Sequence, residues 1–328
     1  MAKIGLVILL LTAVSALHPV QVSAQSGRGY PAKPIKIVVV QTPGGNNDII
    51  ARLFASTMSE ELKQPVLIEN RPGGAGITGV EYVVRSAPDG YTLLMGNTAS
   101  LAIQKGLYAN LPYDPDRDLV AVSLLAVTPN ILVVHPSVAV RNAAELVVLA
   151  KARPDSLNYA STGNGSPTHL AAELFKSRTG AKMVHVPYKG SAPALADLLA
   201  GHIQLMFINV GEAVAHINSG KLTPIVTTGQ TRHPLAPNVP TLVESGIPNA
   251  ELVAFFAITV PAGTPREIIA ILNNAIEKPE RQPEISRRLV ELGAQRVGNS
   301  PEEAEKFIRT ESAKWLSAVR DSGAKVDN

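Results

Sequence analysis

Glycine-rich polar turns supply the residue types in this chain that bind small anions. The first turn, "QTPGGNND", follows the apolar run 35–40 and precedes a helical pattern. Glycine lets the backbone approach a ligand without a Cβ clash, and the first amides of the following helix favour an anion. The turn lacks the nucleotide motifs G-x-x-x-x-G-K-S/T and G-x-G-x-x-G. It contains Gln41, Thr42, Gly44, Gly45, Asn46, Asn47 and Asp48.

One such turn also fits an ordinary connection that binds nothing, but the arrangement recurs three times. Each copy follows an apolar strand pattern, and ligands of open α/β sheets bind beyond the carboxyl ends of the strands. Several neutral donors hold a carboxylate without a buried arginine. The turns therefore predict a site for a small acid with one or two carboxylates. The further candidates are Asn97, Thr98, Ser100, Ser161, Gly163, Asn164, Gly165, Ser166, Thr168, Tyr188, Lys189, Gly190 and Ser191.

Repeated alternation of short apolar strands with helical patterns positions these turns. Nearly continuous apolar strands of this kind are typical of parallel sheets that helices cover on both faces. The expected strands are 35–40, 65–69, 91–96, 157–160, 183–186, 204–208 and 222–227, and the expected helices are 48–63, 75–86, 143–152, 167–178 and 191–200.

Two longer apolar stretches, 119–136 and 252–261, interrupt this alternation. They fit either a central strand pair or two strands that cross between two α/β lobes. Two more helices are expected beyond them, at 265–277 and 301–319, and the second begins with the capping-box spacing of Ser300 and Glu303. Pro279 and Pro283 are expected to interrupt the helical pattern between these two helices.

The first 24 residues have the layout of a secretory signal peptide. Lys3 precedes the apolar stretch 4–17, and small residues end it near Ala24. A buried N-terminal helix is the alternative. The apolar stretch is shorter than the roughly 20 residues that a membrane span needs. We therefore expect export to the periplasm with cleavage near Ala24.

Composition narrows the function further. Without residues 1–24, 29 Lys and Arg residues face 27 Asp and Glu residues, because Lys3 is the one such residue lost. This balance argues against nucleic acid as a partner. The absence of cysteine excludes disulfides and thiolate metal sites.

Catalytic and metal signatures are weak. The sequence has neither H-E-x-x-H nor G-x-S-x-G. His169 and Glu173 have the spacing to share a metal, but a hydrogen bond from His169 near its loop is the simpler interpretation. The segment 69–79 contains a G-x-G-x-x-G pattern that fits a further anion loop. We predict a protein that is not an enzyme and uses no cofactor or metal.

Long ordered segments resemble the substrate-binding receptors of tripartite tricarboxylate transporters, the Bug family. They include "TPGGNNDIIARLF", "YASTGNGSPTHLAAELF", "VPYKGSAPALADLLAGHIQLMF" and "VPAGTPREIIAILN", and the likeness runs from about Pro34 to Ser322. The resemblance implies an α/β, two-lobed periplasmic binding protein of type II, the Venus-flytrap fold. Each lobe is expected to hold a mixed, mostly parallel sheet flanked by helices. Residues 28–129 with 252–328 would form lobe 1, and 130–251 would form lobe 2.

The resemblance also implies a site and a role. Thr42–Asp48 and Ser161–His169 would hold the carboxylates of the ligand, with residues 97–100 and 188–191 alongside and Asn209 in another wall. The chain departs from the family at Gln41, Ile208 and Phe255, where an aromatic residue, an acid and a tryptophan are common. These departures favour a plain carboxylate over an amino acid. We expect a monomeric receptor that delivers its ligand to a membrane carrier, with a sensing subunit or an exported hydrolase as alternatives.

Overall fold

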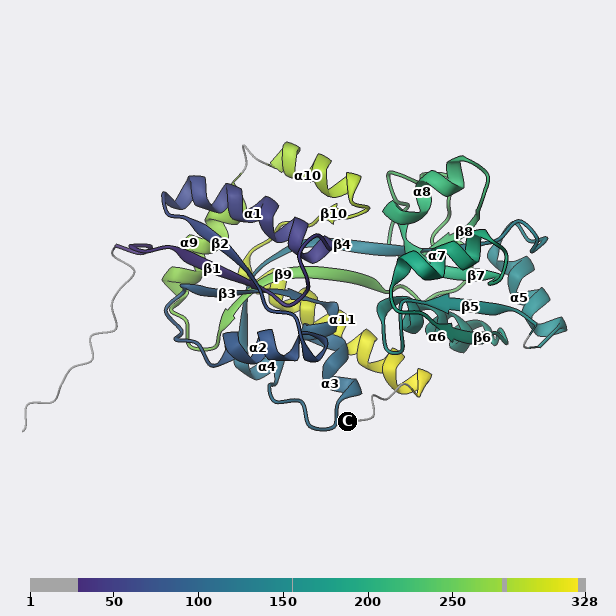
Figure 1. Cartoon of the computed structure of the whole chain (residues 1–328), viewed down its shortest axis with the longest axis horizontal. Helices are drawn as coiled ribbons and strands as arrows, with labels where there is room; N and C mark the ends of the chain where they lie inside the picture. Colours follow the sequence, from purple (N-terminus) through teal and green to yellow (C-terminus); the bar gives the residue numbers. More distant parts are fainter. Residues whose placement is uncertain (1–28, 155, 279–281, 324–328) are drawn as a thin grey trace, which may run out of the picture.

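The fold is an α/β arrangement in which helices flank a curled, mixed sheet (Figure 1). The computed structural model describes residues 29–154, 156–278 and 282–323. The predicted signal peptide lies outside these residues. Within them, no helix combines the length and the apolar content needed to cross a bilayer.

The first part of the chain builds three neighbouring parallel strands, with β1 between β2 and β3. Strands of this kind are joined by helices that cross over the sheet. The polar turns 41–45 and 98 therefore lie where β1 and β3 end. The elements are β1 (Ile35–Val39), α1 (Asn46–Leu62), β2 (Val66–Asn70), a 3-10 turn η1 (Gly74–Gly76), α2 (Ile77–Val84), β3 (Thr92–Asn97), a π-helical turn η2 (Ala99–Ile103), α3 (Gln104–Leu107) and α4 (Pro115–Asp118).

The middle of the chain repeats this construction, with β5 pairing in parallel with both β6 and β7. Its helices begin close to the ends of these strands, as the sequence pattern predicts. The elements are α5 (Ala143–Ala152), β5 (Asn158–Ser161), α6 (Pro167–Thr179), β6 (Val184–Pro187), α7 (Ser191–Leu199), β7 (Leu205–Asn209), α8 (Val210–Asn218) and β8 (Thr223–Thr227).

Two long strands connect these parts, β4 (Leu119–Val134) and β9 (Val253–Pro261). The strand β4 pairs with β9 as far as Pro129, and from Asn130 onward it pairs with β7 and, one residue later, with β8. All these pairings are antiparallel, and the sheet order is β2-β1-β3-β9-β4-β7-β5-β6. The chain then continues through α9 (Arg266–Ile276), α10 (Gln282–Glu291), β10 (Gln295–Arg296) and α11 (Pro301–Ser322).

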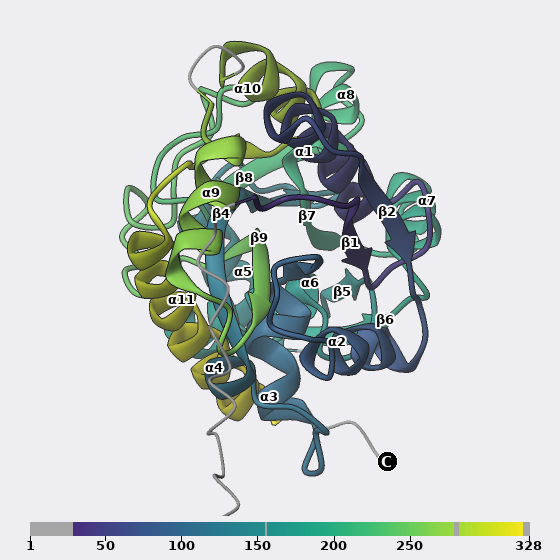
Figure 2. The same ribbon diagram turned by 90° about the vertical axis from the view of Figure 1, so that its left-hand side faces the viewer.

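The C-terminal helix α11 is fixed against β9 by aromatic contacts. Trp315 is fully buried, and its indole Nε1 donates to the carbonyl oxygen of Val253 at 3.3 Å. Phe255 meets Phe307 edge to face, with ring centroids 6.0 Å apart. Figure 2 shows α9 and α11 along the same side of β4 and β9. Helix α11 thus packs on β9, the strand along which the chain returns from the middle part to the first part of the fold.

The predicted elements agree closely with the structure. Every predicted strand is present within two residues of its expected ends, including both long ones. The Ser300–Glu303 capping box is present. Helix α9 ends at Ile276, and Pro283 lies in the first turn of α10, whereas Pro279 lies outside the described residues. The prediction of an α/β fold with mixed sheets and flanking helices is confirmed.

Candidate functional site

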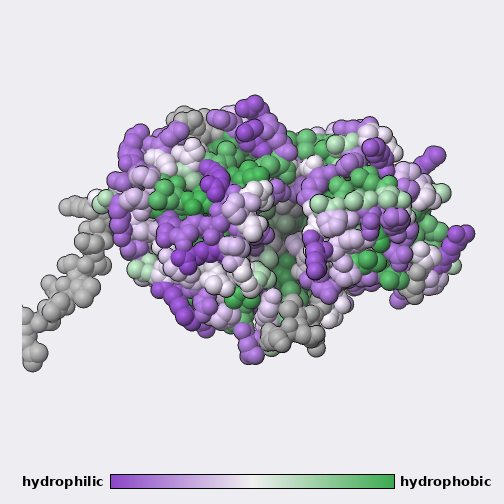
Figure 3. Space-filling model, viewed as in Figure 1, coloured by the Kyte–Doolittle hydropathy of each residue, from purple (hydrophilic) through white to green (hydrophobic). Residues whose placement is uncertain are grey.

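A cavity of about 270 Å³ lies where the first and middle parts of the chain face each other. Figure 3 shows a groove between these two parts on one face of the molecule. All four polar turns reach this cavity, although they are separated by up to 150 residues in the chain. The lining residues are Gln41, Asn46, Asn47, Asn97, Thr98, Ala99, Asn130, Thr162, Pro167, Thr168, Ser191, Ile208, Asn209, Glu212, Ala254, Phe255 and Phe256.

Four helices begin at this cavity, namely α1, α6, α7 and α8. The N-terminal amides of a helix lack partners within the helix, and the helix dipole gives that end a partial positive charge. Helices α1 and α7 begin after Gly45 and Gly190 and have no side-chain cap. The convergence of these helix ends favours a bound anion.

Two buried side-chain amides at the cavity, those of Asn47 and Asn130, contain unpaired polar atoms. Asn47 is fully buried, and neither polar atom of its side chain has a hydrogen-bond partner among the described residues. The same holds for the side-chain nitrogen of Asn130, a residue that is 5% exposed. An unpaired buried polar atom costs about 1–3 kcal/mol, so such atoms are rare without a ligand or water to satisfy them. Both amides line the cavity, where a ligand would reach them.

The first turn is held in place by Asp48. Its carboxylate accepts hydrogen bonds from the backbone nitrogen of Gly44 at 3.0 Å, from Arg52 Nε at 2.9 Å and from Asn70 Nδ2 at 2.9 Å. Burial opposes the charged form, but these hydrogen bonds together outweigh it and lower the pKa of Asp48 to about 2. Asp48 therefore stabilises the turn rather than facing the cavity.

The sequence from α1 to the end of α11 identifies the family. Residues 50–323 match the family described as "Tripartite tricarboxylate transporter family receptor". The chain belongs to this family. Protein BugT of Bordetella pertussis is 37% identical to the receptor over 298 residues, which cover 90% of the receptor and 91% of BugT.

Solved structures resemble the receptor along most of its length. R. palustris Rpa4515 with adipate has 34% identity and a TM-score of 0.77, and the match covers 90% of the receptor and 100% of that chain. MatC from Rhodopseudomonas palustris with bound malate has 30% identity and a TM-score of 0.73, with 88% of the receptor and 100% of that chain covered. These findings confirm the predictions of a periplasmic binding protein fold and of a solute-binding receptor rather than an enzyme.

The structure brings eight of the predicted site residues to the cavity. Some come from the turns in the first part of the chain and some from those in the middle part, so the turns of both parts face one cavity. These residues are Gln41, Asn46, Asn47, Asn97, Thr98, Thr168, Ser191 and Asn209.

The remaining predicted residues belong to the same four segments but do not line the cavity. Several support the turns: Ser100 exchanges hydrogen bonds with Asn97, and Ser166 caps α6 by accepting from the backbone nitrogen of His169 at 3.3 Å. Tyr188 donates to Asp197, and Lys189 is exposed. The residues outside the lining are Thr42, Gly44, Gly45, Asp48, Ser100, Ser161, Gly163, Asn164, Gly165, Ser166, His169, Tyr188, Lys189 and Gly190.

His169 faces the interior of the receptor. Its Nδ1 accepts from the backbone nitrogen of Gly165 at 3.1 Å, and its ring stacks on His185 with centroids 4.0 Å apart. Burial, followed by the neighbouring His169, lowers the pKa of His185 to about 4, so His185 is uncharged at neutral pH, and burial lowers the pKa of His169 as well. Glu173 accepts from Tyr159 and from Lys176. In the described part of the chain, no three His, Asp or Glu side chains form a group suited to a metal ion.

The site list drawn from the sequence omitted several lining residues. Asn130 lies within the long apolar strand β4, and a polar residue in such an apolar run was the sequence signal that could have indicated a ligand contact. Glu212 lies in the first turn of α8, a helix that no glycine-rich turn precedes. Ala99, Thr162 and Pro167 also line the cavity and fall within the predicted segments 97–100 and 161–169, whereas Ile208, Ala254, Phe255 and Phe256 lie outside the predicted segments.

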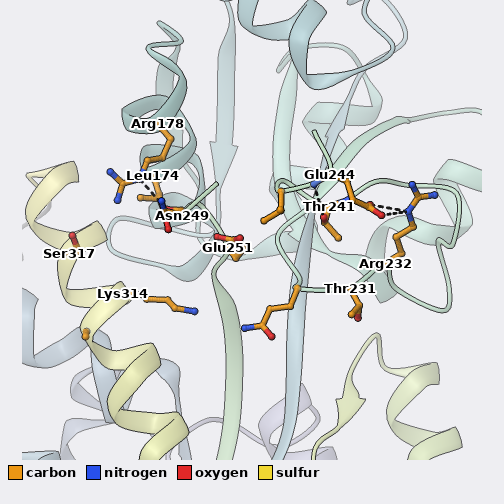
Figure 4. A pocket seen from close by; sticks show the side chains of 13 residues that line it. Leu174, Arg178, Thr231, Arg232, Thr241, Glu244, Asn249, Glu251, Lys314 and Ser317 are labelled. Atoms are coloured by element: carbon orange, nitrogen blue, oxygen red, sulfur yellow. Dashed lines mark hydrogen bonds and ion pairs between the residues drawn. The ribbon is translucent and has the colours of Figure 1, made fainter. Parts of the chain in front are cut away.

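A larger pocket, of about 800 Å³, lies between α6, α11 and the segment 230–251 (Figure 4). Most of its charged groups already have partners: Arg178 Nε donates to the carbonyl oxygen of Asn249 at 3.0 Å, Arg232 pairs with Glu244, and Lys314 pairs with Glu311. None of the four polar turns contributes to it. The smaller cavity, with its uncapped helix ends and unpaired amides, is therefore the candidate ligand site.

The role of Asp48 predicts a stability difference that depends on pH. We expect Asp48→Asn to lower the free energy of unfolding by about 1–2 kcal/mol at pH 7. The folded-state pKa lies below the unfolded one, so this stabilisation is complete above about pH 4 and is lost as the pH falls towards 2. Urea denaturation followed by circular dichroism at pH 7, 3 and 2 measures the difference.

A matched control is Asp321→Asn, which alters an exposed carboxylate at the end of α11. It should leave the free energy of unfolding within about 0.5 kcal/mol of the original at every pH. A deficit for Asp48→Asn that stays constant from pH 7 to 2 would contradict the role assigned to the charge.

Proposed function

We propose that this receptor captures a small carboxylate in the cavity between two lobes and presents it to the membrane subunits of a tripartite transporter. The lobes are residues 28–129 with 252–328, and residues 130–251. A ligand that contacts both lobes in the closed state shifts the balance towards closure by its differential affinity. The receptor acts as a monomer and performs no chemistry on its ligand.

The pairing of β4 supports this division. Its partners change from β9 to β7 between Pro129 and Asn130, and the return strand β9 begins at Val253. The two crossing strands are thus the covalent connections between two groups of parallel strands. Hinge motion between domains is absorbed by a few residues within such connections.

One observation supports the proposed ligand class. A single cavity is surrounded by uncapped helix ends from both parts of the chain and by the unpaired side-chain atoms of Asn47 and Asn130. Neutral donors of this kind hold a carboxylate without a paired cation. The ligands in the solved relatives, adipate and malate, belong to the same chemical class.

The proposal also includes export of the receptor to the periplasm. Residues 1–24 act as a signal peptide, and the mature receptor begins after Ala24 in the periplasm. The family consists of receptors for a transporter, and we propose that membrane carrier subunits are the partner that receives the closed, loaded form.

The experiment is a thermal-shift screen of the mature protein against mono-, di- and tricarboxylates, amino acids and aromatic acids. A ligand present at 100 times its Kd should stabilise the folded state by about 2.7 kcal/mol. Calorimetry then gives the stoichiometry, and NMR of the ligand after hours of incubation shows whether it is chemically unchanged. Native mass spectrometry of the purified protein identifies any acid that co-purifies.

The outcomes separate the alternatives. One ligand bound per chain and recovered intact supports a receptor. Conversion of the ligand to a product would instead indicate an exported hydrolase. Failure of every carboxylate to stabilise the protein would overturn the proposed ligand class.

A further inference from the structure

Glu212 is the one titratable side chain among the residues that line the cavity in the described part of the chain. It lies in the first turn of α8, the helix that begins directly after Asn209. Asn209 caps this helix by accepting from the backbone nitrogen of Gly211 at 2.7 Å. Glu212 is exposed, and among the described residues its carboxylate has no hydrogen-bond or ion-pair partner. A carboxylate therefore faces the space in which the ligand binds.

The helix ends around the cavity consequently differ in charge. Helices α1 and α7 present uncapped amides. The first turn of α7 contains no acid, and Asp48 in the first turn of α1 is paired with Arg52. At α8, Asn209 satisfies an amide, and Glu212 places a negative charge beside the positive end of the dipole. One region of the cavity thus favours an anion, and the region at α8 favours a hydrogen-bond donor or a cation.

No lysine, arginine or histidine lines the cavity among the residues that the structure describes. A second ligand carboxylate near Glu212 would thus meet a negative charge that no side-chain cation offsets. Like charges about 5 Å apart, at an effective dielectric constant of about 20, repel strongly enough to lower the affinity by roughly 100-fold. An ammonium group at the same position would gain a charge-assisted hydrogen bond instead.

We propose that the ligand is an amino-substituted carboxylate, whose carboxylate binds at the uncapped starts of α1 and α7 and whose ammonium group pairs with Glu212. This inference rests on the proposed function and specifies the ligand of that site. It also reverses the preference for a plain carboxylate that followed from the departures at Gln41, Ile208 and Phe255. The acid missing at Ile208 is replaced by one four residues further on, at the start of α8.

The experiment is calorimetric titration at pH 7.5 of the mature protein and its Glu212→Gln variant. The probes are dicarboxylates, α-amino and ω-amino monocarboxylates, and unsubstituted monocarboxylates, matched in chain length from four to six carbons. The control variant, Glu302→Gln, removes an exposed first-turn acid from α11, away from the cavity. Thermal unfolding of all three proteins without ligand checks that they remain folded.

We expect the original protein to bind an amino carboxylate at least ~10-fold more tightly than the dicarboxylate of equal length. Glu212→Gln should weaken binding of the amino carboxylate by ~10- to 100-fold and strengthen binding of the dicarboxylate, whereas Glu302→Gln should change neither.

The inference is overturned, while the proposed function stands, if plain mono- or dicarboxylates bind best and Glu212→Gln leaves their order unchanged. If no probe binds either protein, both the inference and the proposed ligand class fail.

Discussion

Replacing Asn47 with leucine should weaken ligand binding by ~10- to 100-fold and at the same time stabilise the ligand-free protein. The side chain of Asn47 is fully buried at the cavity, and both of its polar atoms are unpaired. A hydrogen bond to a charged group contributes about 1.5–3 kcal/mol, which leucine cannot supply. Removing two unpaired buried polar atoms should in turn raise the free energy of unfolding by about 1–3 kcal/mol.

Calorimetry with the ligand found by the thermal-shift screen and urea denaturation without ligand measure these opposite effects. Asn97→Leu is the matched control, because Asn97 also lines the cavity but its Oδ1 accepts from the backbone nitrogen of Ser100 at 3.0 Å. That variant should lose stability as well as affinity. If Asn47→Leu destabilises the ligand-free protein as much as Asn97→Leu does, Asn47 has a structural partner and its assigned role is wrong.

The second large effect is expected at Gly211, where the two parts of the chain touch backbone to backbone. A Cβ atom at Gly211 would lie 2.9 Å from the nitrogen of Gly293 and 2.9 Å from the carbonyl carbon of Leu292. Gly211 lies in α8 of the middle part, and Gly293 follows α10 of the C-terminal part. Backbone atoms cannot turn aside as a side chain can, so an added methyl group must push the two parts apart.

We expect Gly211→Ala to raise the Kd by ~10-fold or more, because overpacking of a close contact costs about 1–3 kcal/mol. In the ligand-free protein the two parts can move apart and relieve this clash, so the free energy of unfolding should change little, and the higher helix propensity of alanine offsets about 1 kcal/mol of any loss. Calorimetry gives the Kd. Small-angle X-ray scattering tests whether the variant contracts less than the original protein when ligand is added.

Asn218→Ala provides the control for helix propensity. Asn218 is exposed at the end of the same helix, away from the contact between the two parts. It should leave both the Kd and the scattering profile unchanged. Unaltered affinity and full contraction in Gly211→Ala would show that the contact between Gly211 and Gly293 plays no part in closure.

Much of the fold could be predicted from the sequence because it depends on local signals. Continuous apolar runs specified each predicted strand, and Pro167, Ser166 and the Ser300–Glu303 pair specified helix starts. These signals act over a few residues, through backbone preferences and capping hydrogen bonds. The alternation of strands and helices also placed the polar turns at strand ends, where eight of the predicted site residues now line one cavity.

Sequence and structure differ where contacts between distant segments decide the outcome. His169 makes the hydrogen bond near its loop that the sequence favoured, with its Nδ1 accepting from Gly165, but its ring stacks on His185 and does not line the cavity, as the family resemblance had implied it would. Asn130 and Glu212 come from a strand and a helix that carry no glycine-rich turn, and they reach the cavity through the pairing of β4 with β7.

The sequence by itself therefore determined the helices and strands, the turns and the family, because each of these depends on short segments or on the order of such segments along the chain. The tertiary structure alone decided which side chains face the ligand and what charge they bring. A turn fixes where its backbone lies, but the direction of each side chain depends on neighbours that pack against it from other parts of the chain. For this reason the carboxylate of Glu212 could be assigned to the site only from the structure, which places the start of α8 beside the other three helix starts.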